Sequence, residues 1–408
     1  MATITENIQT LRSIKSDIKN AILEKGGVVT DAFGTYAQAI TDLPSGGGGG
    51  GTEIEDALVT RDLSGYYYNN RVSRIGSYAF ANNWRLVSVN IPNGNHIDNH
   101  AFAFCGSLLS ISLPNASIVE GYTFRGCRAL PSIDLPLCTR LGYNAFESCS
   151  VLSNVNLPLC SIISGSAFSN CSALLSISLP NCISIDNHTF YSCRALPSID
   201  LPLCTKLGWN AFESCSALST VNLPLCTYIG SSAFQNCVNL PSINLPNCSY
   251  INGYTFYGCS ALVSVNLPKV TFLGGYAFSG CSKLTSVSLP NCISISDYTF
   301  YRCSSLTSID LPLCTRLGGY GVFSDCSSLI SINIPNCISI GHYVFYDCIN
   351  LSQVYLNSVS SVTSIYNNTF SDCPNLTSVY VPASLVDAFK TAPNWSSISD
   401  KIVAYTEA

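Results

Sequence analysis

Charged side chains are scarce in this chain. Asp, Glu, Lys and Arg together make up 11% of the 408 residues, compared with about 25% in an average soluble protein. The net charge is −5 and Lys and Arg form no cluster. The composition argues against nucleic acid as a partner, because neutralising phosphates requires such clusters. A basic amphipathic helix that would bind a membrane surface is missing as well.

Long apolar runs are absent too. No stretch of about 18 apolar residues, the length that crosses a bilayer, occurs in the sequence. The first 25 residues mix charged and apolar side chains and lack the apolar centre of a signal peptide. We therefore expect neither membrane insertion nor export by the usual secretory route.

Phenylalanine, in contrast, recurs with a fixed period. Fourteen residues, here called the repeat phenylalanines, are spaced by 22 residues up to the eleventh, and the last three intervals are 23, 22 and 25 residues. They are Phe80, Phe102, Phe124, Phe146, Phe168, Phe190, Phe212, Phe234, Phe256, Phe278, Phe300, Phe323, Phe345 and Phe370. Such a period predicts stacked units that bury their apolar faces only against one another. Most of the chain is therefore expected to be a solenoid.

The 22 cysteines follow the same period. Thirteen lie three residues after a repeat phenylalanine, from Cys105 to Cys373, and nine lie two residues after a repeated proline, from Cys138 to Cys337. Like cysteines of adjacent turns would lie about 4.7–4.9 Å apart, but parallel Cβ directions disfavour a disulfide. Close C-x-x-C pairs, typical of metal sites, do not occur. We predict buried reduced thiols and no metal or cofactor; uptake of a soft metal by the thiols stays an alternative.

A single repeat indicates how each turn is built. In residues 145–166, Leu152, Val155 and Leu157 form an L-x-x-V-x-L pattern, and Pro158 follows it. The pattern predicts one short parallel strand per turn, which ends where proline removes a donor from the ladder. This arrangement is typical of a leucine-rich-repeat solenoid.

The repeats resemble the BspA-like class of leucine-rich repeats in particular. The resemblance rests on residues 75–80 (Ile-Gly-Ser-Tyr-Ala-Phe), on residues 277–284 (Ala-Phe-Ser-Gly-Cys-Ser-Lys-Leu) and on the Ser-Leu-Pro that follows at 288–290. It covers about residues 70–382. Residues 379–389, with Trp395 and residues 401–403, are similar to the closing segment of that class.

Four parts are expected along the chain. Residues 1–45 have apolar side chains at every third or fourth position from Ile4 to Ile22 and predict a small α-helical head for virion attachment or oligomerisation. Residues 46–57 begin with six glycines and predict a flexible linker. Residues 58–382 hold the repeats, and residues 383–408 form a cap that covers the last strand edge.

Some repeat blocks recur almost unchanged. Residues 128–138 return residue for residue at 194–204, three turns later, and residues 182–185 return at 292–295. The solenoid therefore displays some of its surface patches in several copies.

Residues suited to catalysis are few. The four histidines, His96, His100, His188 and His342, lie in the turn before a repeat phenylalanine, as surface turn residues would. No G-x-S-x-G, H-E-x-x-H or P-loop motif occurs. Equivalent carboxylates three turns apart would be about 14 Å from each other, too far for an acid–base pair. We predict a protein that is not an enzyme and has no catalytic residue.

Two surfaces are candidates for binding. The first is the concave face, formed by the strand residues that lie between the core positions and carry hydroxyl, amide or carboxylate groups. Its candidate residues are Asp134, Asn156, Asp200, Asn222, Asn244, Asn266 and Asp310. Such side chains also bond to one another along a solenoid, and that alternative stays open.

The second surface is a ridge of aromatic side chains two or three residues before a repeat phenylalanine, or one residue after it. Tyr and Trp among Asn, Gly and Ser suit the recognition of proteins or glycans, although some of these rings are expected to pack between turns. The candidate contact residues are Tyr191, Trp209, Tyr254, Tyr257, Tyr276, Tyr298, Tyr301, Tyr320, Tyr343 and Tyr346.

The N-terminal segment indicates a context for this surface. Residues 14–27 and 33–40, followed by the glycine run, resemble the leader of bacteriophage tail and fibre proteins. The resemblance implies a virion protein assembled in the cytoplasm of a bacterial host. Residues 1–45 would bind other virion proteins, with a homo-oligomer as one arrangement, and the repeats would bind a host-surface protein or glycan. The alternatives are a bacterial cell-surface adhesin and an intracellular leucine-rich-repeat scaffold.

Overall fold

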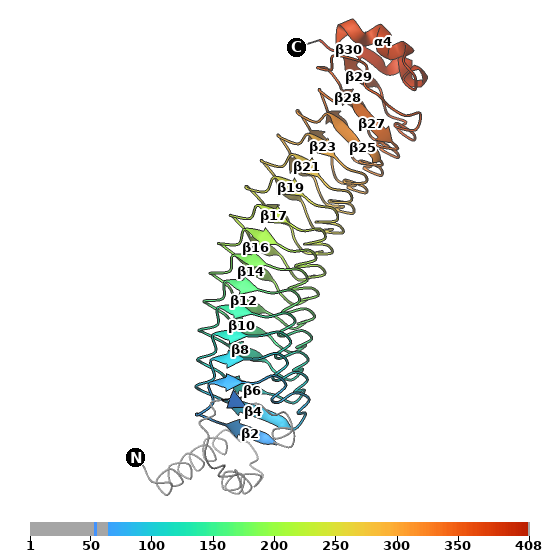
Figure 1. The fold of residues 1–408 in the computed structure, drawn as a ribbon. Helices are drawn as coiled ribbons and strands as arrows, with labels where there is room; N and C mark the ends of the chain where they lie inside the picture. Colours follow the sequence, from blue (N-terminus) through green and yellow to red (C-terminus); the bar gives the residue numbers. More distant parts are fainter. Residues whose placement is uncertain (1–52, 55–63, 407–408) are drawn as a thin grey trace, which may run out of the picture. The chain divides into compact units, whose positions relative to one another are not determined.

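The structure, a computed structural model, describes residues 53–54 and 64–406. The expected helical head and the glycine run lie outside the described residues. Residues 51–408 form a unit of their own, in which about 15 turns of a parallel β-solenoid stack on one another (Figure 1).

Each turn contributes one strand to a first parallel ladder, which interruptions in the pairing divide into five sheets of two to five strands. Val155 lies opposite Ile133 and Ile177 in the neighbouring turns, an offset of 22 residues in each direction. Val155 is buried, whereas Asn154 and Asn156 on either side of it are exposed, as the L-x-x-V-x-L pattern predicts. The strands of this ladder are β2 (Gly65–Tyr68), β4 (Leu86–Asn90), β6 (Ser110–Ser112), β8 (Ser132–Asp134), β10 (Asn154–Asn156), β12 (Ser176–Ser178), β14 (Ser198–Asp200), β16 (Thr220–Asn222), β18 (Ser242–Asn244), β20 (Ser264–Asn266), β22 (Ser286–Ser288), β24 (Ser308–Asp310), β26 (Ser331–Asn333), β28 (Gln353–Tyr355), β29 (Ser378–Val381) and β30 (Ile402–Ala404).

A second parallel ladder corrects the prediction of one strand per turn. It consists mostly of two-residue strands, in which the first side chain points outward and the second into the core, as in Ile162 and Ile163. These pieces are too short for an alternating pattern to reveal, but the common 22-residue register pairs them. They are β1 (Glu53–Ile54), β3 (Arg74–Ile75), β5 (His96–Ile97), β7 (Ile118–Val119), β9 (Arg140–Leu141), β11 (Ile162–Ile163), β13 (Ser184–Ile185), β15 (Lys206–Leu207), β17 (Tyr228–Ile229), β19 (Tyr250–Ile251), β21 (Phe272–Leu273), β23 (Ser294–Ile295), β25 (Arg316–Tyr320) and β27 (Ser339–His342).

A third set of turn-to-turn hydrogen bonds runs along the loop that carries the repeat phenylalanine. The amide groups of Tyr122, Phe124 and Gly126 donate to carbonyls of the next turn at 2.7, 2.7 and 2.8 Å. The backbone is left-handed two residues before and two residues after the phenylalanine, with φ of 60° at Tyr122 and 71° at Gly126. Because L residues disfavour this conformation, we infer that the bonds to neighbouring turns hold it in place.

The repeat phenylalanines form a continuous column inside the solenoid. Consecutive rings are stacked, with centroids 4.8 Å apart for Phe80 and Phe102 and up to 5.8 Å apart for Phe323 and Phe345. All but Phe370, which is partly buried, are fully inaccessible to solvent. The predicted period therefore corresponds to the spine of the core.

The C-terminal segment packs against the last turns. It contains η2 (Ala383–Leu385), α4 (Val386–Thr391), η3 (Ser396–Lys401) and β30, which pairs with β29. Trp395 is fully buried with its ring 6.0 Å from Phe370, and its indole N–H donates to the carbonyl of Thr363 at 2.7 Å. This ring continues the phenylalanine column where the repeat ends.

Candidate functional site

The polar side chains predicted for the concave face bond to one another. The amide of Asn156 donates to Asp134 at 2.9 Å, and the amide of Asn222 donates to Asp200 at 2.7 Å. Two further pairs repeat this arrangement, Asn266 with Asn244 at 2.9 Å and Asn333 with Asp310 at 2.7 Å. All seven predicted residues take part, so much of their hydrogen-bonding capacity is used inside the protein.

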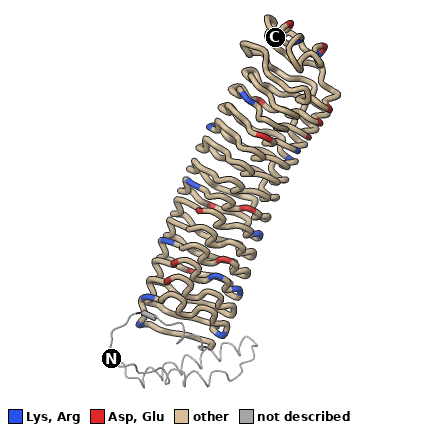
Figure 2. Tube along the Cα trace, turned by 45° about the vertical axis from the view of Figure 1, so that its right-hand side comes forward, with Lys and Arg blue, Asp and Glu red and all other residues tan. Residues whose placement is uncertain are grey.

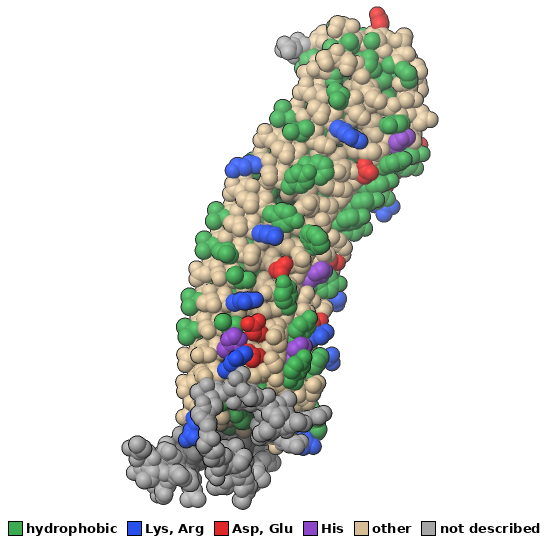
Figure 3. All heavy atoms as spheres, viewed as in Figure 1, with side chains coloured by type: hydrophobic (Ala, Val, Ile, Leu, Met, Phe, Trp, Pro, Cys, Tyr) green, Lys and Arg blue, Asp and Glu red, His purple; other side chains and the backbone are tan. Residues whose placement is uncertain are grey.

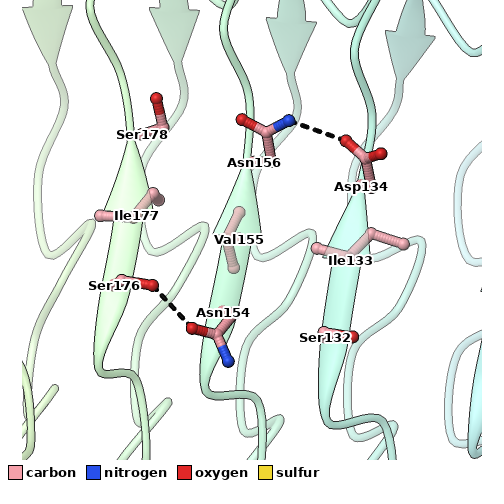
Figure 4. A pocket seen from close by; sticks show the side chains of 9 residues that line it. All are labelled: Ser132, Ile133, Asp134, Asn154, Val155, Asn156, Ser176, Ile177 and Ser178. Atoms are coloured by element: carbon pink, nitrogen blue, oxygen red, sulfur yellow. Dashed lines mark hydrogen bonds between the residues drawn. The ribbon is translucent and has the colours of Figure 1, made fainter.

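A shallow hollow lies on this face where β8, β10 and β12 run side by side (Figure 4). The Asn156–Asp134 bond closes one end of it, and a bond from Ser176 to Asn154, 2.7 Å long, closes the other. Ile133, Val155 and Ile177 line the part between them. Four of the six polar side chains that border the hollow therefore already bond to one another.

Three tyrosines of the predicted ridge form a stacked column, here called the tyrosine column. The rings of Tyr254 and Tyr276 are 4.9 Å apart, and those of Tyr276 and Tyr298 are 5.0 Å apart. Each stands two residues before its repeat phenylalanine, on left-handed backbone. Burial raises the pKa of the Tyr276 phenol, and the neighbouring Tyr254 and Tyr298 add to this shift. Tyr254, at one end, remains 42% exposed.

The column ends at an inserted residue. The 23-residue interval between Phe300 and Phe323 places Gly321, with φ of 52°, where the next tyrosine would stand. A Cβ atom on Gly321 would lie 2.5 Å from the Tyr298 ring, so the ring occupies the space that glycine leaves open. Tyr320 is displaced onto β25 and stacks on His342 at 5.1 Å instead.

The remaining ridge residues lie in separate groups. Tyr257, Tyr301 and Tyr346, each one residue after a repeat phenylalanine, pack at an angle against the tyrosine three residues earlier, with ring centroids 5.7–5.9 Å apart. The partner of Tyr346 is Tyr343. They alternate along the solenoid with the buried Ser279 and Ser324, so these tyrosines recur at every second turn.

The early part of the predicted ridge is less continuous. Tyr191 packs against His188 at 6.0 Å. Trp209 is 55% exposed and has no stacked aromatic neighbour among the described residues. The single ridge expected from the sequence is therefore a series of aromatic groups, of which the tyrosine column is the longest run of stacked tyrosines.

A second row of aromatic residues, two of them exposed and one half-buried, was missed by the sequence analysis. Tyr228, Tyr250 and Phe272, here called the strand row, are the outward residues of β17, β19 and β21. Tyr250 stacks on Phe272 at 4.8 Å, and the Lys206 ammonium lies 5.7 Å from the Tyr228 ring centre. Their common position in the repeat could have revealed the row. Each lies two residues after the cysteine that follows the repeated proline, or after Val270, which replaces that cysteine in one turn.

Most of the histidines lie in aromatic stacks rather than together. His100 is sandwiched between Tyr78 and Tyr122 at 4.6 and 4.7 Å, and His342 lies between Tyr320 and Tyr366. Burial lowers the pKa of His100, and the nearby Arg125 charge lowers it further. These contacts agree with the surface turn positions predicted for the histidines.

The thiols also have defined structural partners. Every cysteine three residues after a repeat phenylalanine donates to the carbonyl of the repeat phenylalanine in the turn before its own; Cys259, which follows Phe256, donates to Phe234 at 3.1 Å. Burial raises the pKa of Cys149, Cys215 and Cys259 to about 12. All 22 cysteines are free thiols, and all but Cys373 are fully buried. At neutral pH such thiols are protonated and poorly reactive.

Charged groups are scattered singly along the solenoid (Figure 2). Some form ion pairs, such as Arg74 with Asp98 at 2.9 Å and Arg125 with Glu147 at 2.8 Å. Over residues 53–54 and 64–406, no three His, Cys, Asp or Glu side chains are placed to hold a metal ion. None of the helices in this same part of the chain has the length and apolar character to cross a membrane.

These features define a leucine-rich-repeat solenoid with exposed aromatic rows. A family model described as a BspA type leucine-rich repeat region matches residues 60–175, 117–239, 161–285, 227–348 and 271–398. The chain therefore belongs to the BspA-type leucine-rich repeat family. A comparison with curated proteins found no match.

Solved structures of leucine-rich repeat proteins are similar to this chain. One from Bacteroides ovatus is 28% identical, with a TM-score of 0.68 over 82% of this chain and 88% of that chain. A leucine-rich cell surface protein from Faecalibacterium prausnitzii is 21% identical, with a TM-score of 0.41 over 82% and 90% of the two chains. The pneumococcal vaccine antigen PcpA is 17% identical, with a TM-score of 0.43 over 87% and 92%.

Proposed function

We propose that this protein is a non-enzymatic adhesion protein whose repeats bind a ligand displayed on a cell surface. The tyrosine column carries the proposal. Its rings are ordered by stacking but stay partly accessible, so little side-chain freedom is lost when a ligand binds. Large aromatic side chains held in this way dominate many binding surfaces.

The composition of the exposed surface supports recognition rather than catalysis. Hydroxyl, amide and aromatic groups predominate, and charges are few, so binding depends on shape and hydrogen bonding more than on electrostatic steering. The repeated blocks at 128–138 and 194–204 present the same chemistry twice. On a surface that displays many ligand copies, repeated sites increase the overall affinity.

Binding of the full-length labelled chain to intact cells tests the proposal. We expect saturable binding to at least one bacterial or host cell type, and a clear loss of it in the double variant Tyr254→Ser, Tyr298→Ser. The matched control is Tyr143→Ser, since Tyr143 is 57% exposed and lies outside the column. Absence of binding to every cell type, or equal binding by the double variant, would refute adhesion through this column.

A second candidate places the same repeats on a phage particle. It rests on the resemblance of residues 14–27 and 33–40 to leaders of phage tail and fibre proteins, and these residues lie outside the described part. Under this proposal, deleting residues 1–45 abolishes incorporation into particles while the repeats remain folded by circular dichroism. Normal incorporation of the deleted chain would exclude virion attachment through the head and leave the cell-surface adhesin.

A further inference from the structure

The strand row and the tyrosine column run along the same part of the solenoid. Within one turn, Tyr250 of the strand row and Tyr254 of the column are separated by the buried Ile251 and by Asn252 and Gly253. In the next turn, Phe272 and Tyr276 are separated in the same way by the buried Leu273 and by Gly274 and Gly275. In Figure 3, hydrophobic side chains lie along the right-hand edge and nearer the middle of the visible face, with other surface between them.

The surface between the two rows, here called the glycine strip, is formed by Gly230, Gly253, Gly274 and Gly275 with Ser231 and Asn252. Close packing requires some of these glycines, because a Cβ atom on Gly274 would lie 2.5 Å from the backbone of Gly253. Gly275 is different, since its nearest neighbour would be the Asp297 carbonyl oxygen at 3.3 Å. The equivalent position carries Asn187 and Trp209 in earlier turns. Packing therefore does not require glycine at position 275, and the lack of a side chain there leaves the surface of the strip open.

The chemistry of this strip is uncharged. Lys206 lies at one end, beside Tyr228. Asp297 lies at the other end, where its carboxylate accepts the amide groups of Gly319 and Tyr320. The five phenol hydroxyls of the two rows form no hydrogen bond to another described residue, so they remain available to a ligand. A charged ligand would find no counter-charge along the middle of the strip.

We propose that the glycine strip binds a neutral, linear glycan that lies parallel to the solenoid axis. Tyr250 and Tyr254, which are 47% and 42% exposed, offer aromatic surface for contact with sugar C–H groups, and sugar hydroxyls pair with free phenols. Two successive turns, those of Tyr250 and Phe272, offer the same set of ring, glycine and ring at an interval of about 4.8 Å, close to the length of one sugar unit. A repeated set of subsites suits a polymer of repeated units. This inference rests on the proposed adhesion and names its ligand class.

Affinity electrophoresis of the full-length chain tests the proposal, with soluble mixed-linkage β-glucan, arabinoxylan and galactomannan as probes. We expect retardation by at least one of these neutral polymers. Gly275→Trp fills the strip with the side chain that Trp209 carries at the equivalent position of an earlier turn, and it should weaken binding about tenfold or more. Tyr250→Ala removes one ring of the strand row and should weaken binding to the same extent. The matched controls are Gly165→Trp, at the equivalent position outside the strip, and Tyr143→Ala. Circular dichroism checks that all four variants remain folded.

Several outcomes would overturn the glycan assignment. No retardation by any polymer, or equal weakening by the control variants, would do so. So would dimerisation of the chain that Gly275→Trp abolishes, because the strip would then bind a second copy. The cell-binding assay separates this inference from the function itself. If Gly275→Trp and Tyr250→Ala bind cells as well as the parent chain does, the strip is not the site although adhesion stands; if the parent chain binds no cells, adhesion fails.

Discussion

Replacing one phenylalanine inside the buried column tests how stability is distributed along the solenoid. Phe234 is fully buried and stacks on Phe212 at 5.5 Å and on Phe256 at 5.6 Å. Truncation to alanine leaves a cavity of nearly a whole ring, which typically costs about 3–5 kcal/mol. Each lost stacking contact accounts for about 0.5–1.5 kcal/mol within that range. We expect Phe234→Ala to cost about 4 kcal/mol in local stability.

The location of this loss distinguishes a solenoid from a globular core. Each turn contacts only its neighbours, so stability is approximately a sum of turn and interface contributions. Native-state hydrogen exchange should therefore show faster opening of amides near residues 212–256. Amides near Phe102 should exchange as in the parent chain. Phe234→Leu serves as the control, since it retains most of the buried apolar volume and should cost less than half as much.

Two results would contradict this reasoning. An equal increase in exchange at all turns would show that the solenoid unfolds as one cooperative unit. A loss of less than about 1 kcal/mol would show that neighbouring rings collapse into the cavity, because the cost depends on how well the site closes.

Three further predictions concern the loop, the cap and the thiols. Gly321→Ala should cost about 1–2 kcal/mol in denaturant unfolding because of its left-handed φ and the contact with Tyr298, whereas Gly275→Ala should stay within about 0.5 kcal/mol; equal effects would contradict the role of Gly321. Trp395→Ala should expose the C-terminal cap to limited proteolysis before any other part of the solenoid, because the indole fills the end of the core; unchanged cleavage would oppose this. Burial raises the pKa of thiols such as Cys149 from 9.0 to about 12, and this shift stabilises the folded state fully below pH 9. The melting temperature should therefore fall between pH 9 and about 12, and a constant melting temperature over that range would contradict the burial of the thiols.

Much of the fold follows from the period in the sequence. Spacing of 22 residues predicts stacking, and the L-x-x-V-x-L pattern places the strand at Asn154–Asn156, where β10 lies. The second ladder was not predictable in the same way, since a two-residue strand such as Ile162–Ile163 has no room for alternation. Its strands pair because whole turns stack in one 22-residue register, which places Ile162 opposite Ser184 and Ile163 opposite Ile185.

The candidate sites were harder to derive because they depend on which neighbours meet. Tyr320 was expected on the ridge with Tyr298, but the one-residue insertion moves it to β25. Tyr250 and Phe272 were not predicted, because a single aromatic residue in a two-residue strand resembles a core position until the direction of its side chain is known. Asp134 and Asn156 were recognised as polar neighbours, and their mutual hydrogen bond matches the alternative kept open from the start.

The common register of the three hydrogen-bond ladders has a consequence for the evolution of this gene. Whole 22-residue units can be gained or lost by recombination between near-identical blocks, such as 128–138 and 194–204, without disturbing any retained interface. Recombination between these two blocks, which lie three turns apart, would lengthen or shorten the arm by about 14 Å. A single inserted residue, as before Phe323, is absorbed within its own turn by a glycine. The reach of the protein can therefore change in steps of whole turns while the chemistry of each turn is preserved.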